Sequence, residues 1–101
     1  MVKKTRDAVK ILERVTGDDL ELQQMIEEEY VNIQVAQMIY DARVSAGITQ
    51  TQLAELVGTH QSTIARLENS DYRGHSLKML KRIASALKLN LEVRFLPRSV
   101  A

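Results

Sequence analysis

Apolar residues in the first half of the chain recur at helical spacing. Residues 5–15 show this spacing over one short amphipathic segment, which predicts a first helix. Residues 19–46 contain neither glycine nor proline, so a single helix of about 40 Å could form there at about 1.5 Å per residue. The three glutamates at 27–29 and the β-branched Val31 could instead divide this region. The pattern alone leaves open whether residues 18–46 form one helix or two.

Residues 49–69 predict two short helices joined by a tight turn. Thr49 and Gln52 have the spacing of a capping box, which begins a helix at this point. Gly58 can adopt the left-handed conformation that ends this helix, and a second helix follows over residues 61–68. Helices this short are not stable alone and must pack on the rest of the domain. The positions predicted to be buried are Leu53, Ala54, Leu56, Val57, Ile64 and Leu67.

The last third of the chain changes from helical to alternating periodicity. Ser76 can cap a helix over residues 77–87, whose inward face would consist of Leu77, Leu80, Ile83, Ala84 and Leu87. Residues 90–96 alternate apolar and polar side chains, which predicts a β-strand ended by Pro97. A lone strand leaves its backbone groups unpaired, so we expect it to pair with the same strand of a second copy. The sheet edge of another protein is the alternative partner.

Together these patterns predict a mainly all-α fold. We expect a bundle of five to six helices that contains a helix-turn-helix, plus one C-terminal strand that pairs between subunits. The chain divides into an N-terminal helical region (1–31), a helix-turn-helix domain (32–89) and a C-terminal strand and tail (90–101). The strand side chains expected to mediate dimerisation are Leu91, Val93 and Phe95.

The outer face of the second short helix carries side chains suited to reading DNA bases. Burial of Ile64 and Leu67 would leave the opposite side of this helix exposed. Glutamine can pair with adenine, arginine with guanine, and alanine can contact the thymine methyl group. The expected base-contacting residues are therefore Gln61, Ser62, Ala65 and Arg66. Polar surface residues without a role in DNA binding are the alternative.

Phosphate contacts are expected at the two ends of this unit. Gln50 opens the first short helix, where a side-chain amide and free N–H groups can hold a phosphate; simple capping is its alternative role. His60 precedes the second helix and could contact DNA or shield the turn. Asn69 and Arg73 lie at and after the end of that helix, a frequent place for phosphate contacts.

This central unit resembles the phage-repressor-like, or Cro/C1-type, helix-turn-helix family, also called the XRE family. The resemblance rests on the Thr49-Gln50 opening, the LAELVG run and the Leu67-Glu68-Asn69 ending, and it extends over residues 40–89. It implies that the second helix meets base edges in the major groove of double-stranded DNA. A homodimer of such domains can read a palindromic operator.

The same resemblance assigns a structural role to Arg43 and Glu68. In relatives, the matching residues form an ion pair between the helix before the unit and the end of the recognition helix. Arg43 is therefore expected to hold the domain together rather than to contact DNA, despite its charge.

Composition and residue spacing argue against several other functions. The chain has 101 residues and no cysteine, so disulfides and thiolate ligands are excluded. His60 and His75 are separated by a whole helix, and Ser62 lacks an orienting acid. We therefore expect no catalytic site, no metal and no cofactor. The chain shows neither a membrane-length apolar run nor a signal peptide, so we expect a cytoplasmic protein.

The net charge of +1 conceals an uneven distribution. Residues 1–14 carry a net charge of +3, residues 15–42 of −7 and residues 43–101 of +5. The basic C-terminal part suits a polyanion such as DNA, whereas the acidic block would repel one. Solvated helix faces are the alternative explanation of the acidic block.

The order of elements in the whole chain resembles HigA-like antitoxins of type II toxin–antitoxin systems. Their partners, RelE/HigB-like toxins, are small basic ribonucleases, whose RNA-binding surface an acidic helix could mask. The resemblance implies a DNA-binding antitoxin that captures its toxin through residues 1–31 and represses its own operon. The alternatives are a stand-alone dimeric repressor and an interaction protein that reuses the fold without binding DNA.

Overall fold

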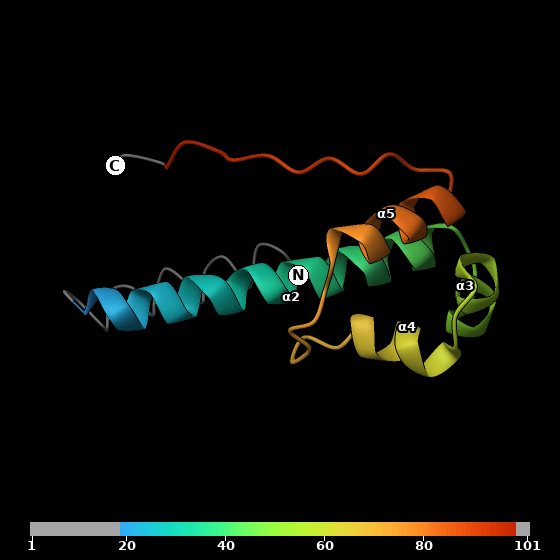
Figure 1. Ribbon diagram of the computed structural model, residues 1–101, viewed down its shortest axis with the longest axis horizontal. Helices are drawn as coiled ribbons and strands as arrows, with labels where there is room; N and C mark the ends of the chain where they lie inside the picture. The colour runs from blue at the N-terminus through green and yellow to red at the C-terminus, as the bar shows by residue number, and fades with distance from the viewer. Residues whose placement is uncertain (1–18, 99–101) are drawn as a thin grey trace.

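Four helices make up the part of the chain that this computed structural model describes, residues 19–98 (Figure 1). They are α2 (Leu20–Ser45), α3 (Gln50–Val57), α4 (Gln61–Leu67) and α5 (Leu77–Ala86). The mainly helical fold is thus confirmed, whereas the predicted five to six helices are not found within residues 19–98. The helix predicted over residues 5–15 lies outside the described residues, as does much of the region 1–31.

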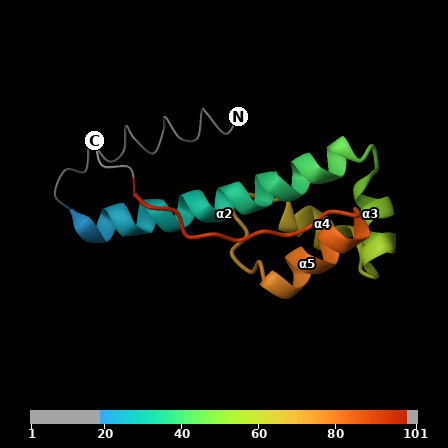
Figure 2. The ribbon, with the colours of Figure 1, turned by 90° about the horizontal axis from the view of Figure 1, so that it is seen from above.

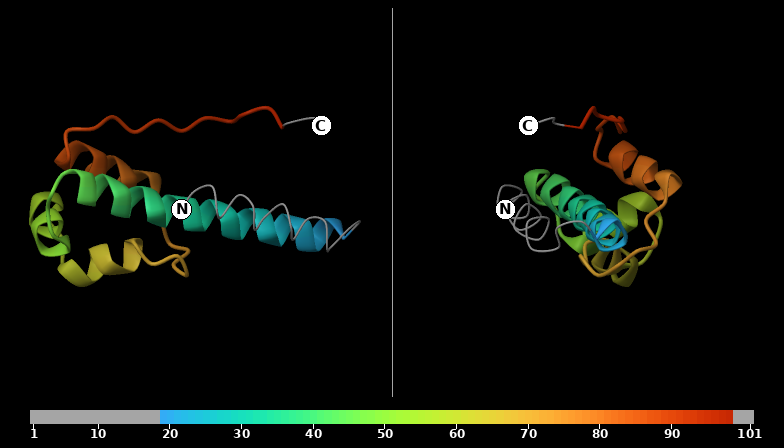
Figure 3. Two further views of the ribbon diagram at one scale, coloured as in Figure 1. Left: turned by 180° about the vertical axis from the view of Figure 1, so that it is seen from behind. Right: turned by 90° about the vertical axis from the view of Figure 1, so that its left-hand side faces the viewer.

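α2 is one continuous helix, which answers the question that the sequence left open. Asp19 caps its N-terminus, since the carboxylate accepts a hydrogen bond from the Leu22 N–H at 2.9 Å. The glutamates at 27–29 lie inside the helix without interrupting it. The buried residues of α2, Ala36 and Ile39, both lie in its C-terminal half. The N-terminal half therefore projects beyond the other helices (Figures 1 and 3).

The turn between α3 and α4 forms from local signals. The Thr49 hydroxyl accepts a hydrogen bond from the Gln52 N–H at 3.1 Å, and the Gln52 side chain accepts one from the Thr49 N–H at 2.8 Å. This reciprocal capping box starts α3. Gly58 ends the helix with a φ of 83°, and its N–H bonds to the Ala54 carbonyl at 2.9 Å. The chain then turns and enters α4 after His60.

The core lies where α3, α4 and α5 pack on the C-terminal half of α2. Ile39, Leu53 and Ile64 are its largest fully buried side chains. Two predicted core positions are wrong, because Leu56 is 60% exposed and Leu77 is 65% exposed. Apolar spacing shows which face of a helix is hydrophobic but does not show how far a neighbouring element covers that face.

The strand predicted over residues 90–96 is not found. No strand occurs within residues 19–98, and residues 90–97 make no backbone hydrogen bonds to another described segment. A β-strand is defined by such pairing, and the described part of this single chain supplies no partner. The segment instead runs extended alongside α2, in the opposite direction (Figures 1 and 2). Dimerisation through Leu91, Val93 and Phe95 therefore stays a prediction.

Candidate nucleic-acid interface

α4 presents a polar face to solvent. Gln61, Ser62 and Arg66 are exposed and Ala65 is half-buried, whereas the apolar side of the helix is buried against α3. His60, the residue before the helix, is exposed and makes no capping hydrogen bond with its side chain. The first N–H groups of α4 therefore have no side-chain acceptor from this residue. The predicted base-contacting residues thus lie together on one accessible face.

A chain of side-chain hydrogen bonds fixes the start of this face. Gln61 donates from Nε2 to Oε1 of Gln50 at 2.7 Å, and Gln50 donates from Nε2 to Oε1 of Glu68 at 3.1 Å. Each amide has a second N–H and a second acceptor lone pair that these bonds leave unused. The structure therefore joins the residue predicted to hold a phosphate to the first residue predicted to meet a base.

Glu68 continues this chain into an ion pair with Arg43. The Arg43 Nε lies 2.7 Å from Oε2 of Glu68, and Nη2 lies 3.1 Å from Oε1. The third nitrogen, Nη1, donates to the Ile48 carbonyl at 2.9 Å. The Arg43 and Glu68 side chains are only 12% and 4% exposed. The hydrogen bond to Glu68 raises the pKa of Arg43, and desolvation by burial opposes it. This bidentate pair ties the end of α4 to α2.

The two predicted phosphate contacts after α4 are already engaged within the protein. Oδ1 of Asn69 accepts a hydrogen bond from the Asp71 N–H at 2.8 Å, which folds the start of the loop. Arg73 forms an ion pair with Glu29 of α2, and both side chains are about half exposed. The Asn69 Nδ2 group can still donate to a phosphate. Arg73 can do so through N–H groups that the ion pair leaves unused, or by exchanging Glu29 for the phosphate.

The loop between α4 and α5 contains a contact that the sequence reasoning missed. Nε2 of His75 lies 2.7 Å from the Leu67 carbonyl, so this nitrogen is the donor. The imidazole packs edge-on against Tyr72, with ring centroids 5.1 Å apart. Gly74 lies under the Tyr72 ring, where a Cβ would not fit. The contact holds the loop against the end of α4. The sequence signal for this contact is a pair of rings, Tyr72 and His75, on either side of Gly74 in a polar loop.

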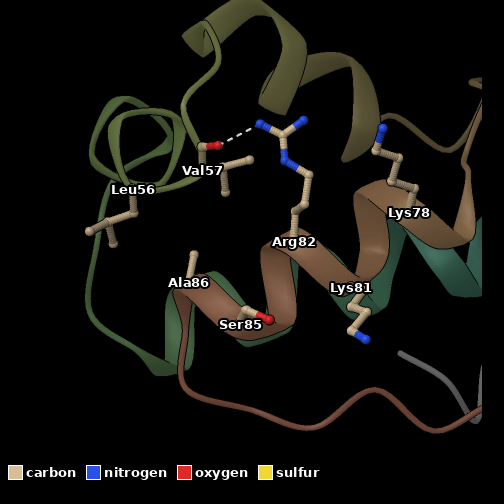
Figure 4. A pocket seen from close by; sticks show the side chains of 7 residues that line it. All are labelled: Leu56, Val57, Lys78, Lys81, Arg82, Ser85 and Ala86. Atoms are coloured by element: carbon tan, nitrogen blue, oxygen red, sulfur yellow. Dashed lines mark hydrogen bonds between the residues drawn. The ribbon is translucent and has the colours of Figure 1, made fainter.

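Three cations of α5 lie along an open hollow between α3 and α5 (Figure 4). Lys78, Lys81 and Arg82 line this hollow of about 510 Å³ together with the exposed Leu56. The Nη2 group of Arg82 donates to the Val57 carbonyl at 2.7 Å, which satisfies one of the last carbonyls of α3. Arg82 therefore supports the helix-turn-helix from behind the turn. Arg82 lies outside the apolar stripe of α5, and the sequence alone gives no sign of this contact.

None of the described helices combines the length and the apolar character that crossing a bilayer requires.

Comparisons with known proteins identify the family. Searches of curated proteins and of solved structures give no match. A helix-turn-helix family model matches residues 39–93, which is more than half of the chain and includes all of the predicted DNA-contacting residues. Because this match coincides with the α3–turn–α4 geometry, the chain belongs to the XRE-type helix-turn-helix family of DNA-binding transcription regulators.

Proposed function

We propose that this protein is a dimeric repressor that binds a palindromic operator through α4. It represses by occupying the operator and catalyses no reaction. The observation that carries the proposal is the hydrogen bond between Gln50 and Gln61, 2.7 Å long. It fixes one amide at the start of α3 and one on the exposed face of α4 before DNA arrives. Side chains that are held in their bound geometry lose less conformational entropy on binding. Arg66 adds a guanidinium on the same face, suited to guanine.

Selection from random duplex DNA tests this function. The enriched sequence is expected to contain two symmetric half-sites whose centres lie about 10–10.5 base pairs, or a multiple, apart. Its affinity is expected to exceed that for random DNA by at least about 10³-fold. Binding to both is expected to weaken as salt rises, because phosphate contacts release counterions. Absence of an enriched sequence would contradict base readout, and a single unpaired half-site would contradict the dimer.

A second candidate function is neutralisation of a RelE/HigB-like toxin, which would make the protein an antitoxin that represses its own operon. The projecting half of α2 supports it. Leu20 and Met25 are exposed there, next to the exposed acids Glu21 and Glu28. The negative charge of this half of α2 complements the basic surface of such a ribonuclease. Within residues 19–98, this half of α2 makes little contact with the core and is open to a partner.

Charge reversal on α2 tests the antitoxin function. The double variant Glu21→Lys/Glu28→Lys is expected to lose co-purification with the small basic product of the neighbouring gene, because like charges would face each other. Its affinity for the operator is expected not to decrease. Glu55→Lys is the control for a reversed charge outside α2 and is expected to retain the toxin. Toxin capture by the double variant as strong as by the wild type would contradict the proposal.

A further inference from the structure

The extended C-terminal segment is held at both ends and exposed between them. Leu91 packs against the core, and Arg98 donates to both carboxylate oxygens of Glu27 on α2 at 3.2 and 3.3 Å. Between these attachments, Val93 is 67% exposed and Phe95 is fully exposed. The backbone of residues 90–97 is unpaired within the described part of the chain. The segment therefore offers an open strand edge and large apolar side chains at the same place.

A groove of about 730 Å³ lies between this segment, α2 and α5. Its apolar lining comes from Val31, Val35 and Met38 of α2, Leu77 and Leu80 of α5, and the segment itself. Met38 and Leu77 are exposed in the single chain. The groove and the open strand edge thus adjoin, and both would be covered by one more extended chain lying beside the segment.

We propose that this additional extended chain is the C-terminal segment of a second copy of the protein. The two segments pair antiparallel, and the two Val93 residues face each other at the two-fold axis. In that register Glu92 faces Arg94 of the second copy, and Leu91 faces Phe95 of the second copy. Within one chain, Glu92 and Arg94 already lie on the same side of the segment, with Oε1 and Nε 3.1 Å apart. The ribbon therefore has one charged face with two opposite-charge pairs and one apolar face, and it adjoins the groove of each copy.

Neighbouring registers lack this complementarity. An axis at Glu92 places two glutamates opposite each other, and an axis at Arg94 places two arginines opposite each other. An axis between two residues sets apolar side chains against charged ones. A parallel, in-register pair also stacks like charges. The register centred on Val93 is the one in which every facing pair from Leu91 to Phe95 is favourable, and it buries the otherwise fully exposed Phe95.

Single cysteines test the register directly, because the chain contains no cysteine of its own. Directly opposed residues of an antiparallel pair have Cα atoms about 4.5–5.5 Å apart, within the range of a disulfide. Under mild oxidation, Val93→Cys is expected to form a covalent dimer on a non-reducing gel. Glu92→Cys and Arg94→Cys are each expected to form no covalent dimer alone and to form a disulfide-linked dimer when mixed. Self-linking at all three positions would indicate an in-register parallel pair and overturn the antiparallel register, and linking at none would overturn the proposal as a whole.

A charge swap gives a second, independent measurement. Glu92→Arg is expected to weaken dimerisation about tenfold in sedimentation equilibrium, because it creates two Arg–Arg contacts across the ribbon. The swapped variant Glu92→Arg/Arg94→Glu is expected to recover affinity to within about threefold of the wild type. Lys81→Glu reverses a charge outside the ribbon and is the control. A swap that fails to rescue the single variant would overturn the register.

This inference deepens the dimeric function proposed above, yet both measurements are made without DNA. Failure of the cysteine and charge-swap tests would reject the ribbon while leaving operator binding to its own assay. Conversely, a protein that forms the ribbon but enriches no DNA sequence would reject the repressor and retain the interface.

Discussion

Replacing Glu68 by alanine is expected to lower the free energy of unfolding by about 3–5 kcal/mol. The substitution leaves the guanidinium of Arg43, only 12% exposed, without the carboxylate that compensates its desolvation. It also removes the acceptor of the Gln50 amide, so the hydrogen-bond chain to Gln61 loses its anchor. Urea unfolding followed by circular dichroism measures the loss of stability.

Two comparisons separate this pair from ordinary surface charge. Glu55→Ala removes an exposed acid from α3 and is expected to change stability by about 0.5 kcal/mol or less. The double variant Arg43→Met/Glu68→Leu removes both buried charges and is expected to be more stable than Glu68→Ala. A loss below about 1 kcal/mol for Glu68→Ala would show that the pair behaves like an exposed one.

Replacing Arg66 by alanine is expected to weaken operator binding by about 1–3 kcal/mol, or roughly 5- to 150-fold. Arg66 is exposed on the face of α4 that carries Gln61, and a guanidinium can bind both major-groove acceptors of guanine. Loss of such a contact removes discrimination at one base position in each half-site. Titrations against the operator and against operators substituted at each position measure this effect.

The control for Arg66→Ala is a substitution that removes a positive charge outside α4. Lys81→Ala removes one exposed positive charge from α5 and is expected to leave base preference intact. If Arg66→Ala weakened binding to operator and to random DNA equally, Arg66 would be a phosphate contact rather than a base contact.

The helix-turn-helix could be predicted because its signals are local. The capping box of Thr49 and Gln52 and the left-handed Gly58 act within a few residues and form as predicted. The sequence could not decide whether α2 is one helix or two. The glutamates at 27–29 repel one another, which favours a break, but no residue that breaks a helix lies in this region. Exposure of Leu56 and Leu77 could not be predicted either, since it depends on where neighbouring helices end.

Contacts between distant residues show a similar limit. The face of α4 follows from its periodicity, whereas the bond between Gln50 and Gln61 depends on the distance between two helices. The strand predicted from the alternation over residues 90–96 is wrong for the single chain, because a strand also needs a partner, which one sequence does not supply. The hydrogen bond of His75 also depends on a distance that the sequence does not show, because its acceptor, the Leu67 carbonyl, lies eight residues earlier in the chain.

The ion pair between Arg73 and Glu29 has a consequence for communication between the two ends of the molecule. In the case where the phosphate predicted for Arg73 replaces Glu29 as its partner, DNA frees Glu29, and a basic partner that takes Glu29 releases Arg73. Each ligand then improves the affinity of the other by the same factor, because thermodynamic linkage is reciprocal. An exposed pair is worth at most about 1 kcal/mol, so this coupling is at most about fivefold. Through this contact, a partner bound to α2 would change the affinity for the operator only modestly and would not turn repression on or off.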